Sequence, residues 1–443
     1  MAGGLYRLEG RIQHYAWGGH EFIPALLGFP PTPETPYAEY WLGAHERAPA
    51  MILEEAGGGG DSSRSFRAWG RASAYADAPV PARAGGRSAN GPPGAVSTAI
   101  FEEDRPTPLD RRIADRPEET LGAEVAARYG RLPYLLKVLD VARPLSIQVH
   151  PTRAQAEAGF ARENRRGIPL DSPRRNYKDR NHKPELMVAL SDFWLLHGFL
   201  PEEQLRRVLE SIPEFRELRG DLAQGGLPAL YRRVMLMPPA EVEAILGPLT
   251  ARLRRSGAQD RSSPDYWLLR IAAERPSDRG LFSLYFLNLV HLRPGQGIFQ
   301  AAGIPHAYLR GQNVEVMANS DNVLRGGLTD KHVDVEELLR IVRFEGIRPR
   351  IIEPVAEDGP EAVYPTPASD FALHRISLEA GAVAERHSRS LEILLVMEGG
   401  AVMSSGPRRL VLHRGQSVVA LAATNYRIEA VGAKAEIFRV SLP

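Results

Sequence analysis

Four polar residues have the side-chain chemistry of a metal site: Gln148 and His150, two apart in the chain, and the more distant Glu185 and His306. Amide oxygen, imidazole nitrogen and carboxylate oxygen are all ligands of divalent metals in proteins. Gln148 and His150 lie in a run with the composition of a strand, in which alternate side chains point to opposite faces. Ile147 and Val149 would then face a core, while Ser146, Gln148 and His150 would face one shared space. This pattern predicts a metal site in the mouth of a β-barrel.

The predicted third and fourth ligands follow from two further segments. Glu185 precedes the apolar run 186–190, which has the composition of a buried strand, and Pro184 suits a strand start, where a missing N–H is tolerated. Lys183 is two residues before Glu185 and would share its face, placing a positive charge beside the carboxylate. His306 would supply the fourth ligand from a later strand.

Each of these residues also has an ordinary structural interpretation. A single strand histidine is commonly a hydrogen-bonded structural residue, and Glu185 could simply form an ion pair with Lys183. Lys137 lies inside the aliphatic run 135–139. An inward lysine is unfavourable unless it meets an anion, and the alternative is a lysine at a sheet edge whose charged end reaches solvent.

Composition excludes several kinds of site. The 443 residues are too many for one simple core, and 43% apolar with 25% charged residues is typical of a soluble globular protein. The net charge of +1 gives no electrostatic case for nucleic acid or membrane partners. The chain has no cysteine, so disulfides, thiolate nucleophiles and cysteine zinc sites are excluded. We find no secretory h-region and no apolar run long enough to span a membrane, and we therefore expect a cytoplasmic location.

The chain alternates between strand-like and helix-like stretches. Residues 5–54 have the pattern of short strands and turns, and the Gly, Ala, Ser, Arg and Pro content of 55–105 predicts a flexible surface insertion. A helix is expected over 109–130, strands over 132–150, and several helices over 201–280. Strands are expected to resume at 281, a helix at 334–342, and a small barrel or sandwich over 364–443.

Several motifs together resemble a known family. The most specific are Gln148-Val149-His150-Pro151 and the run Asn181 to Glu185, with support from 15–19, 38–45, 132–139 and 305–328. The chain resembles the type I mannose-6-phosphate isomerases (phosphomannose isomerases) of the cupin superfamily. The resemblance implies a mainly β fold with a helical insert: two cupin-like β-barrels of the jelly-roll type plus an α-helical domain. We expect a zinc domain from 1–200 and 281–346, a helical insert at 201–280, and a second barrel without metal at 347–443.

The resemblance also implies roles for individual residues. It implies Zn²⁺, one per chain, held by Gln148, His150, Glu185 and His306. It implies a basic set consisting of Lys137, Lys183 and Arg325, and a polar set consisting of Ser146, His182, Glu315 and Asp321. Tyr15 and Trp17, with Glu39, are expected to shape or close the pocket. The expected partner is a phosphorylated hexose, and we expect a monomer.

The implied reaction converts mannose 6-phosphate to fructose 6-phosphate through an enediolate, which carries negative charge on oxygen. A zinc site with one carboxylate keeps a positive charge that favours this intermediate, and Arg325 suits the developing oxyanion. Lys137, Lys183 and Ser146 are expected to hold the phosphate. We favour Lys183 for proton transfer. His182, Glu315, Asp321 and a metal-bound water stay as alternatives.

A short internal repeat links the two strand-rich regions. Residues 292–299 resemble 412–419, and continuing this match aligns His306 with Tyr426. Arg389 would then stand where His150 stands. On this alignment the second barrel has lost two ligands and should bind no metal.

Two other functions compete with the isomerase interpretation. An iron cupin dioxygenase usually shows more histidine ligands, and the neutral amide of Gln148 argues against it. A non-catalytic two-barrel binding or storage protein would have no need for Lys137, Lys183 and Arg325 near the metal.

Overall fold

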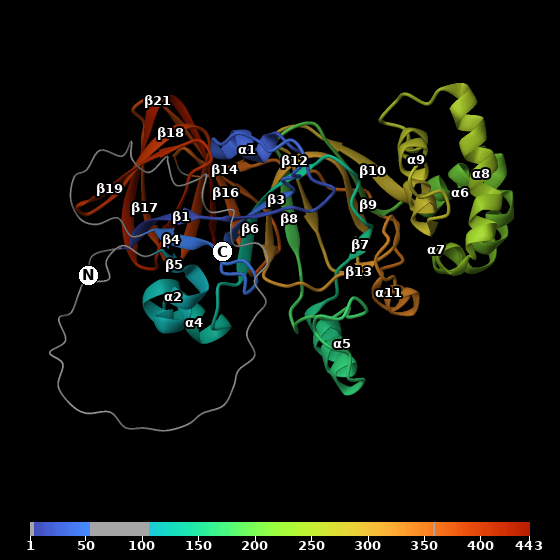
Figure 1. The fold of residues 1–443 in the computed structure, drawn as a ribbon, viewed down its shortest axis with the longest axis horizontal. Coiled ribbons are helices and arrows are strands. Elements are labelled where there is room, and N and C mark those ends of the chain that lie inside the picture. Colours follow the sequence, from blue (N-terminus) through green and yellow to red (C-terminus); the bar gives the residue numbers. More distant parts are fainter. Residues whose placement is uncertain (1–3, 54–105, 358) are drawn as a thin grey trace.

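The computed structural model describes residues 4–53, 106–357 and 359–443. The predicted insertion at 55–105 lies outside this described part of the chain. The described residues form two large antiparallel sheets and eleven α-helices, so the fold is mainly β, as predicted. The C-terminal strands lie at one end of the molecule and α6 to α9 at the other (Figure 1).

The ten-stranded sheet contains the predicted metal-site residues. It consists of β2 (Arg11–Gln13), β3 (Glu39–Gly43), β6 (Tyr134–Val141), β7 (Gln148–Val149), β8 (Glu185–Ala189), β9 (Phe193–Phe199), β10 (Leu287–Leu292), β11 (Gly297–Gln300), β12 (His306–Ala318) and β13 (Leu324–Arg325). Strand β12 is its centre, because it pairs with β6, β7, β8 and β9. These pairings bring segments from positions 137, 148, 185 and 306 together.

The eleven-stranded sheet combines both ends of the chain. It consists of β1 (Leu5–Glu9), β4 (Met51–Leu53), β5 (Thr107–Pro108), β14 (Val355–Ala356), β15 (Glu361–Tyr364), β16 (Ala372–Glu379), β17 (Val383–Ser388), β18 (Glu392–Ser405), β19 (Arg408–His413), β20 (Ser417–Ala420) and β21 (Thr424–Ser441). The pairing differs from the predicted division of the chain, because β1 pairs with β20 and with β4. The N-terminal strands thus cover an edge of the C-terminal sheet, which would otherwise present unpaired backbone groups.

Helices fill most of the stretch predicted as a helical insert. They are α6 (Glu202–Ser211), α7 (Arg219–Leu236), α8 (Pro239–Ser256) and α9 (Pro264–Ala272), with 3-10 turns at Pro213–Leu218 and Arg279–Phe282. The strand predicted from 281 begins only at Leu287, because α10 (Ser283–Phe286) comes first. Phe282 and Phe286 pack against Phe215 in the helical core. An apolar run of this length has no period that distinguishes a helix from a strand.

The helix predicted over 109–130 is three short helices: α2 (Leu109–Asp115), α3 (Pro117–Leu121) and α4 (Ala123–Tyr129). Gly122 breaks it with a φ of 88°, which is open to glycine and rarely to other residues. The helix predicted at 334–342 is confirmed as α11 (Val335–Ile341), whereas α1 (Phe22–Leu27) and α5 (Arg153–Arg165) were not anticipated. Within the described residues, no helix has the length and apolar character to cross a membrane.

Candidate active site

The core of the site is a carboxylate between two imidazoles. The Glu185 Oε1 atom lies 3.3 Å from His150 Nε2, and its Oε2 atom lies 3.4 Å from His306 Nε2. The two imidazole ring centroids are 5.0 Å apart. One donor atom from each of the three residues lies within 4.8 Å of the others, and all three side chains are buried. This part of the predicted ligand set therefore converges.

The strand register also brings the fourth predicted ligand to this point. Gln148 is the cross-strand neighbour of His306 on β12 and of Arg325 on β13. Gln148 is half-buried, so its amide lies nearer the solvent than the imidazoles do. The predicted convergence of Gln148 with His306 and Arg325 thus has a direct cause in the pairing of β7.

Backbone carbonyls orient both imidazoles. The His150 Nδ1 atom lies 2.8 Å from the Asn322 carbonyl oxygen, and His306 Nδ1 lies 3.0 Å from that of Ile304. Each Nδ1–H can donate to its carbonyl, which leaves Nε2 as the free lone pair facing Glu185. Burial lowers the pKa of His150 to about 4, so its ring is neutral near pH 7. His150 Nε2 is buried without a hydrogen-bond partner. A divalent cation fits this nitrogen and oxygen donor set.

Lys183 lies beside the carboxylate, as the spacing predicted. Its Nζ atom is 2.9 Å from Glu185 Oε1. Burial alone would raise the pKa of Glu185, but the charge of Lys183 and the contacts with the histidines hold it well below its usual value. The carboxylate is therefore ionised and able to bind a cation.

Lys137 meets anions inside the sheet. Its Nζ atom lies 3.3 Å from Glu39 and 3.7 Å from Glu315, and 4.9 Å from the centre of the Trp41 ring. Burial acts against the ammonium, but the carboxylates outweigh it and raise the pKa of Lys137. Glu315 accepts a hydrogen bond from the Tyr308 hydroxyl at 2.7 Å. Burial and the nearby charge of Glu185 raise the pKa of Glu315 to about 7.

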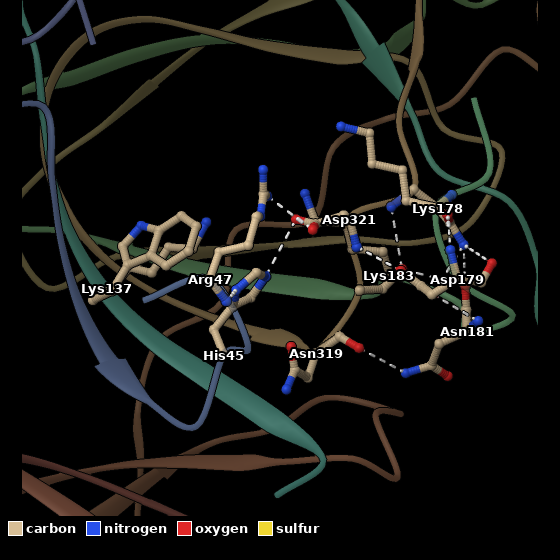
Figure 2. A network of polar contacts seen from close by, with 12 residues as sticks. His45, Arg47, Lys137, Lys178, Asp179, Asn181, Lys183, Asn319 and Asp321 are labelled. Atoms are coloured by element: carbon tan, nitrogen blue, oxygen red, sulfur yellow. Dashed lines mark hydrogen bonds and ion pairs between the residues drawn. The ribbon is translucent and has the colours of Figure 1, made fainter. Parts of the chain in front are cut away.

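A polar network lies next to the cluster (Figure 2). His45 and Arg47 point toward Asp321, at 3.4 Å and 2.8 Å. Burial alone would raise the pKa of Asp321, but these two partners hold it well below its usual value. The Asp321 backbone N–H donates to Asp179, and Asn322 also binds Asp179. The network fixes the 319–322 loop, whose Asn322 carbonyl orients His150.

Three other predicted site residues, His182, Tyr15 and Trp17, contact residues outside the Glu185 cluster. His182 lies away from the cluster, because its Nε2 atom is 2.8 Å from Asp370 and 3.0 Å from Arg153. Tyr15 stacks on Trp17 with ring centroids 5.8 Å apart. Burial, followed by the charge of Glu39, raises the pKa of Tyr15.

Ser146 and Arg325 are both half-buried. Ser146 lies between Leu145 and Ile147, whose backbone N–H groups donate to Tyr308 and Gly327. Burial lowers the pKa of Arg325 from its usual value.

Sequence reasoning missed three residues near the site. Tyr308 had a signal, since it is two residues after His306 on the same strand and so shares its face. His197 is the buried cross-strand neighbour of His306, and burial lowers its pKa to about 4. Burial, followed by the charge of Arg325, lowers the pKa of Lys331. Neither His197 nor Lys331 lies in a motif that would have marked it.

The fold and this donor set define a metal-binding protein with its site inside a β scaffold. Residues 5–65 and 95–202 match the family model of the phosphomannose isomerase type I catalytic domain. Mannose-6-phosphate isomerase of Salmonella typhimurium is 35% identical over 422 residues, covering 93% of this chain and 94% of the relative. The human mannose-6-phosphate isomerase is 30% identical, covering 91% and 89%.

Solved structures agree with these relatives. A zinc-bound mannose 6-phosphate isomerase has a TM-score of 0.80 and 33% identity, covering 99% of both chains. The Salmonella typhimurium enzyme bound to its substrate fructose 6-phosphate and zinc has a TM-score of 0.80 and 32% identity, also covering 99% of both chains. The chain belongs to the type I phosphomannose isomerases.

Proposed function

We propose that this chain is a zinc-dependent isomerase that interconverts mannose 6-phosphate and fructose 6-phosphate through an enediolate. The observation that supports this most strongly is the buried Glu185 between His150, His306 and Lys183. A relative that is 32% identical along nearly its whole length has been seen with fructose 6-phosphate and zinc bound. We also propose that the two strand-rich halves are cupin-like barrels, of which the first alone binds metal.

The proposed zinc ligands are Gln148, His150, Glu185 and His306. When bound, zinc supplies a Lewis acid that polarises the sugar carbonyl. Because Glu185 is the only anionic member of this set, the site keeps a net positive charge. That charge favours the enediolate over the neutral sugar, which is the differential binding that catalysis requires.

Arg325 is the proposed partner of the developing oxyanion. Arg325 lies on β13 directly opposite Gln148. Its backbone is therefore next to that of a proposed metal ligand. Arginine stays protonated through the reaction and donates several N–H groups in a fixed plane. A donor held in place before the charge develops needs no reorganisation as the enediolate forms.

Lys183 is the proposed proton carrier between C1 and C2. His182 is bound to Asp370, and Asp321 to Arg47, whereas Lys183 contacts Glu185 of the cluster directly. Glu315 is the second candidate, since it is buried close to Lys137 and Tyr308 in the same sheet. The variants Lys183→Met and Glu315→Gln distinguish the two candidates. The variant that loses exchange of the substrate proton with solvent identifies the proton carrier.

The proposed phosphate contacts differ from the predicted set of Lys137, Lys183 and Ser146, because Lys183 is now the proposed proton carrier. Lys137 is already neutralised by Glu39 and Glu315, so we propose that it positions Glu315. Ser146 stays the proposed phosphate contact, together with Lys331 near Arg325. Tyr15 and Trp17 are proposed to close the pocket from the edge. The monomeric state and the cytoplasmic location stay predictions.

The test is isomerisation in deuterated water. Zinc-loaded protein is incubated with mannose 6-phosphate and the product is followed by NMR. An enediolate formed by removal of the C2 proton accepts a solvent deuteron at C1, so fructose 6-phosphate should carry deuterium there. Fructose 6-phosphate that stays free of deuterium at full equilibration would contradict the enediolate, and absence of the product would contradict the isomerase function.

A further inference from the structure

A second hollow lies outside the Glu185 cluster, between α9 and the ten-stranded sheet. Its volume is ≈ 520 Å³, within the range that small-molecule ligands occupy. It is lined by residues of the 16–20 segment, of the loop after β6, of α9 and of β12. None of the four proposed zinc ligands lines it. We name this hollow the arginine groove.

The arginine groove has an excess of positive charge. Four arginines line it, Arg143, Arg270, Arg275 and Arg310, against the single carboxylate of Glu274. Arg275 is paired with Asp330 at 2.6 Å and with Glu274 at 3.8 Å. Within the described residues, Arg143, Arg270 and Arg310 form no ion pair. Arg270 instead lies over the Tyr266 ring, 5.5 Å from its centre.

These three unpaired arginines do not come from one charged stretch of sequence. They are at positions 143, 270 and 310, and only the fold brings them to one cavity. Like charges held around one hollow repel each other and raise the free energy of the folded state. A bound polyanion removes that repulsion, and arginine is the residue best suited to bind phosphate oxygens.

The floor of the groove is apolar. Trp267, Leu309 and Leu328 line it and are 1%, 0% and 4% exposed. The half-buried Trp17 forms part of the wall and stacks on Tyr15. A sugar phosphate would place hydroxyl groups on this floor without partners, which is unfavourable. A flat aromatic base suits the floor, and its phosphates suit the rim.

From this combination we infer that the arginine groove binds a nucleoside diphosphate. The phosphates contact Arg143, Arg270 and Arg310, and the base lies against the half-buried Trp17. The inference is independent of the isomerase function, because the groove and the Glu185 cluster share no lining residue among the proposed ligands. Trp17 also belongs to the proposed edge of the catalytic pocket, where its ring stacks on Tyr15.

The test is calorimetric titration of the intact chain with ADP, GDP and inorganic pyrophosphate at low and at physiological ionic strength. The wild type should bind the two nucleotides, and binding should weaken with salt. Arg270→Ala and Arg310→Ala should each weaken binding roughly tenfold, as expected for loss of a charge-assisted hydrogen bond. Arg254→Ala is the matched control, because Arg254 is an exposed arginine of α8 outside the groove.

Four results would overturn the inference. The first is no nucleotide binding by the wild type at millimolar concentration. The second is equal weakening in Arg254→Ala and Arg270→Ala. The third is pyrophosphate binding as tight as that of ADP and GDP, which would remove the role of the apolar floor. Displacement of the nucleotide by mannose 6-phosphate would also overturn it, because the probe would then occupy the catalytic pocket.

Discussion

In the ten-stranded sheet, β12 pairs with β6, β7 and β8, and in the eleven-stranded sheet β21 pairs with β16, β17 and β18. The residue pairs correspond as well. His306 lies opposite Gln148 on β7, as Tyr426 lies opposite Arg386 on β17. The framework that holds the proposed zinc ligands is therefore present twice, with different side chains.

The same correspondence extends to the charged interior. Glu185 and Glu392 are each the first residue of their strand, β8 and β18. Glu315 lies opposite Lys137, and the matching pair in the C-terminal sheet is Arg439 opposite His374. A glutamate in the first sheet is thus replaced by an arginine in the second.

This replacement of a negative charge by a positive one alters what the interior of each sheet can bind. The Arg439 guanidinium lies 2.7 Å from Glu392 and 2.7 Å from Glu361, and the Tyr426 hydroxyl also donates to Glu392. The C-terminal carboxylates are thus neutralised by a cation belonging to the chain. Lys183 contacts one oxygen of Glu185, and the Nε2 atoms of His150 and His306 lie beside the carboxylate. The comparison teaches that the position of the cation matters. Arg439 bridges both C-terminal carboxylates, whereas Lys183 contacts one oxygen of Glu185 and leaves the imidazoles of His150 and His306 beside it.

The largest effect should come from removing a proposed zinc ligand in the ten-stranded sheet. Glu185→Ala and His306→Ala should lose zinc and lower kcat/KM by at least about 10³-fold, since both the Lewis acid and its charge are lost. Tyr426→Phe at the matching position should keep zinc and change kcat/KM less than about twofold. Metal analysis and steady-state kinetics check both. A comparable loss of zinc in Tyr426→Phe would contradict the claim that only the ten-stranded sheet binds the metal.

Arg325→Ala should separate binding of metal from turnover. The variant should keep its zinc while kcat falls about 10²-fold to 10³-fold, the range for removal of one oxyanion donor. Metal content and kcat measured on the same preparation check this prediction. Loss of zinc together with activity would show that Arg325 supports the ligands and has no separate role in the reaction.

The third prediction concerns stability in the C-terminal interior. Arg439→Ala should lower the free energy of unfolding by about 3–5 kcal/mol, because it leaves Glu392 buried without its cation, while Glu361 keeps Arg386. Urea denaturation measures this. Arg409→Ala is the matched control, since Arg409 is an exposed residue of the same sheet, and it should change stability by less than about 0.5 kcal/mol. Equal stability of the two variants is the contradicting outcome.

The smallest expected effect is a pH dependence from His374. Burial, together with Arg439, lowers the pKa of this histidine from 6.5 to about 4. The unfolded chain therefore binds a proton that the folded chain does not, and stability falls as the pH drops from 6.5 toward 4. The loss attributable to His374 is at most about 3 kcal/mol. His374→Gln should remove it, so parallel pH profiles of unfolding for both proteins would refute the assignment.

Sequence reasoning predicted the metal cluster because each ligand lies in a short, recognisable segment. The two-residue spacing of Lys183 and Glu185 correctly placed both side chains together, 2.9 Å apart. The run 144–150 was predicted as one strand, but only Gln148–Val149 pairs. The anionic partners of Lys137, which are Glu39 and Glu315, could not be identified from an isolated lysine.

Strand register and long-range pairing were harder to predict from the sequence. The short glycine-containing repeat aligned His306 with Tyr426, and these two residues lie opposite Gln148 and Arg386. It also matched Arg389 with His150, but the register gives Ser388 as the counterpart, because the count from Tyr426 runs through Arg386. The family resemblance implied a place for His182 at the site, yet its partner Asp370 lies 188 residues away. No local pattern contains that information.

The most direct test of the central claim is an anomalous diffraction map at the zinc edge. The account predicts one strong peak per chain, within bonding distance of His150, Glu185 and His306, and no peak at Glu361, His374 or Glu392 in the described C-terminal interior. A peak at the C-terminal carboxylates, or none beside Glu185 in zinc-loaded protein, would contradict it.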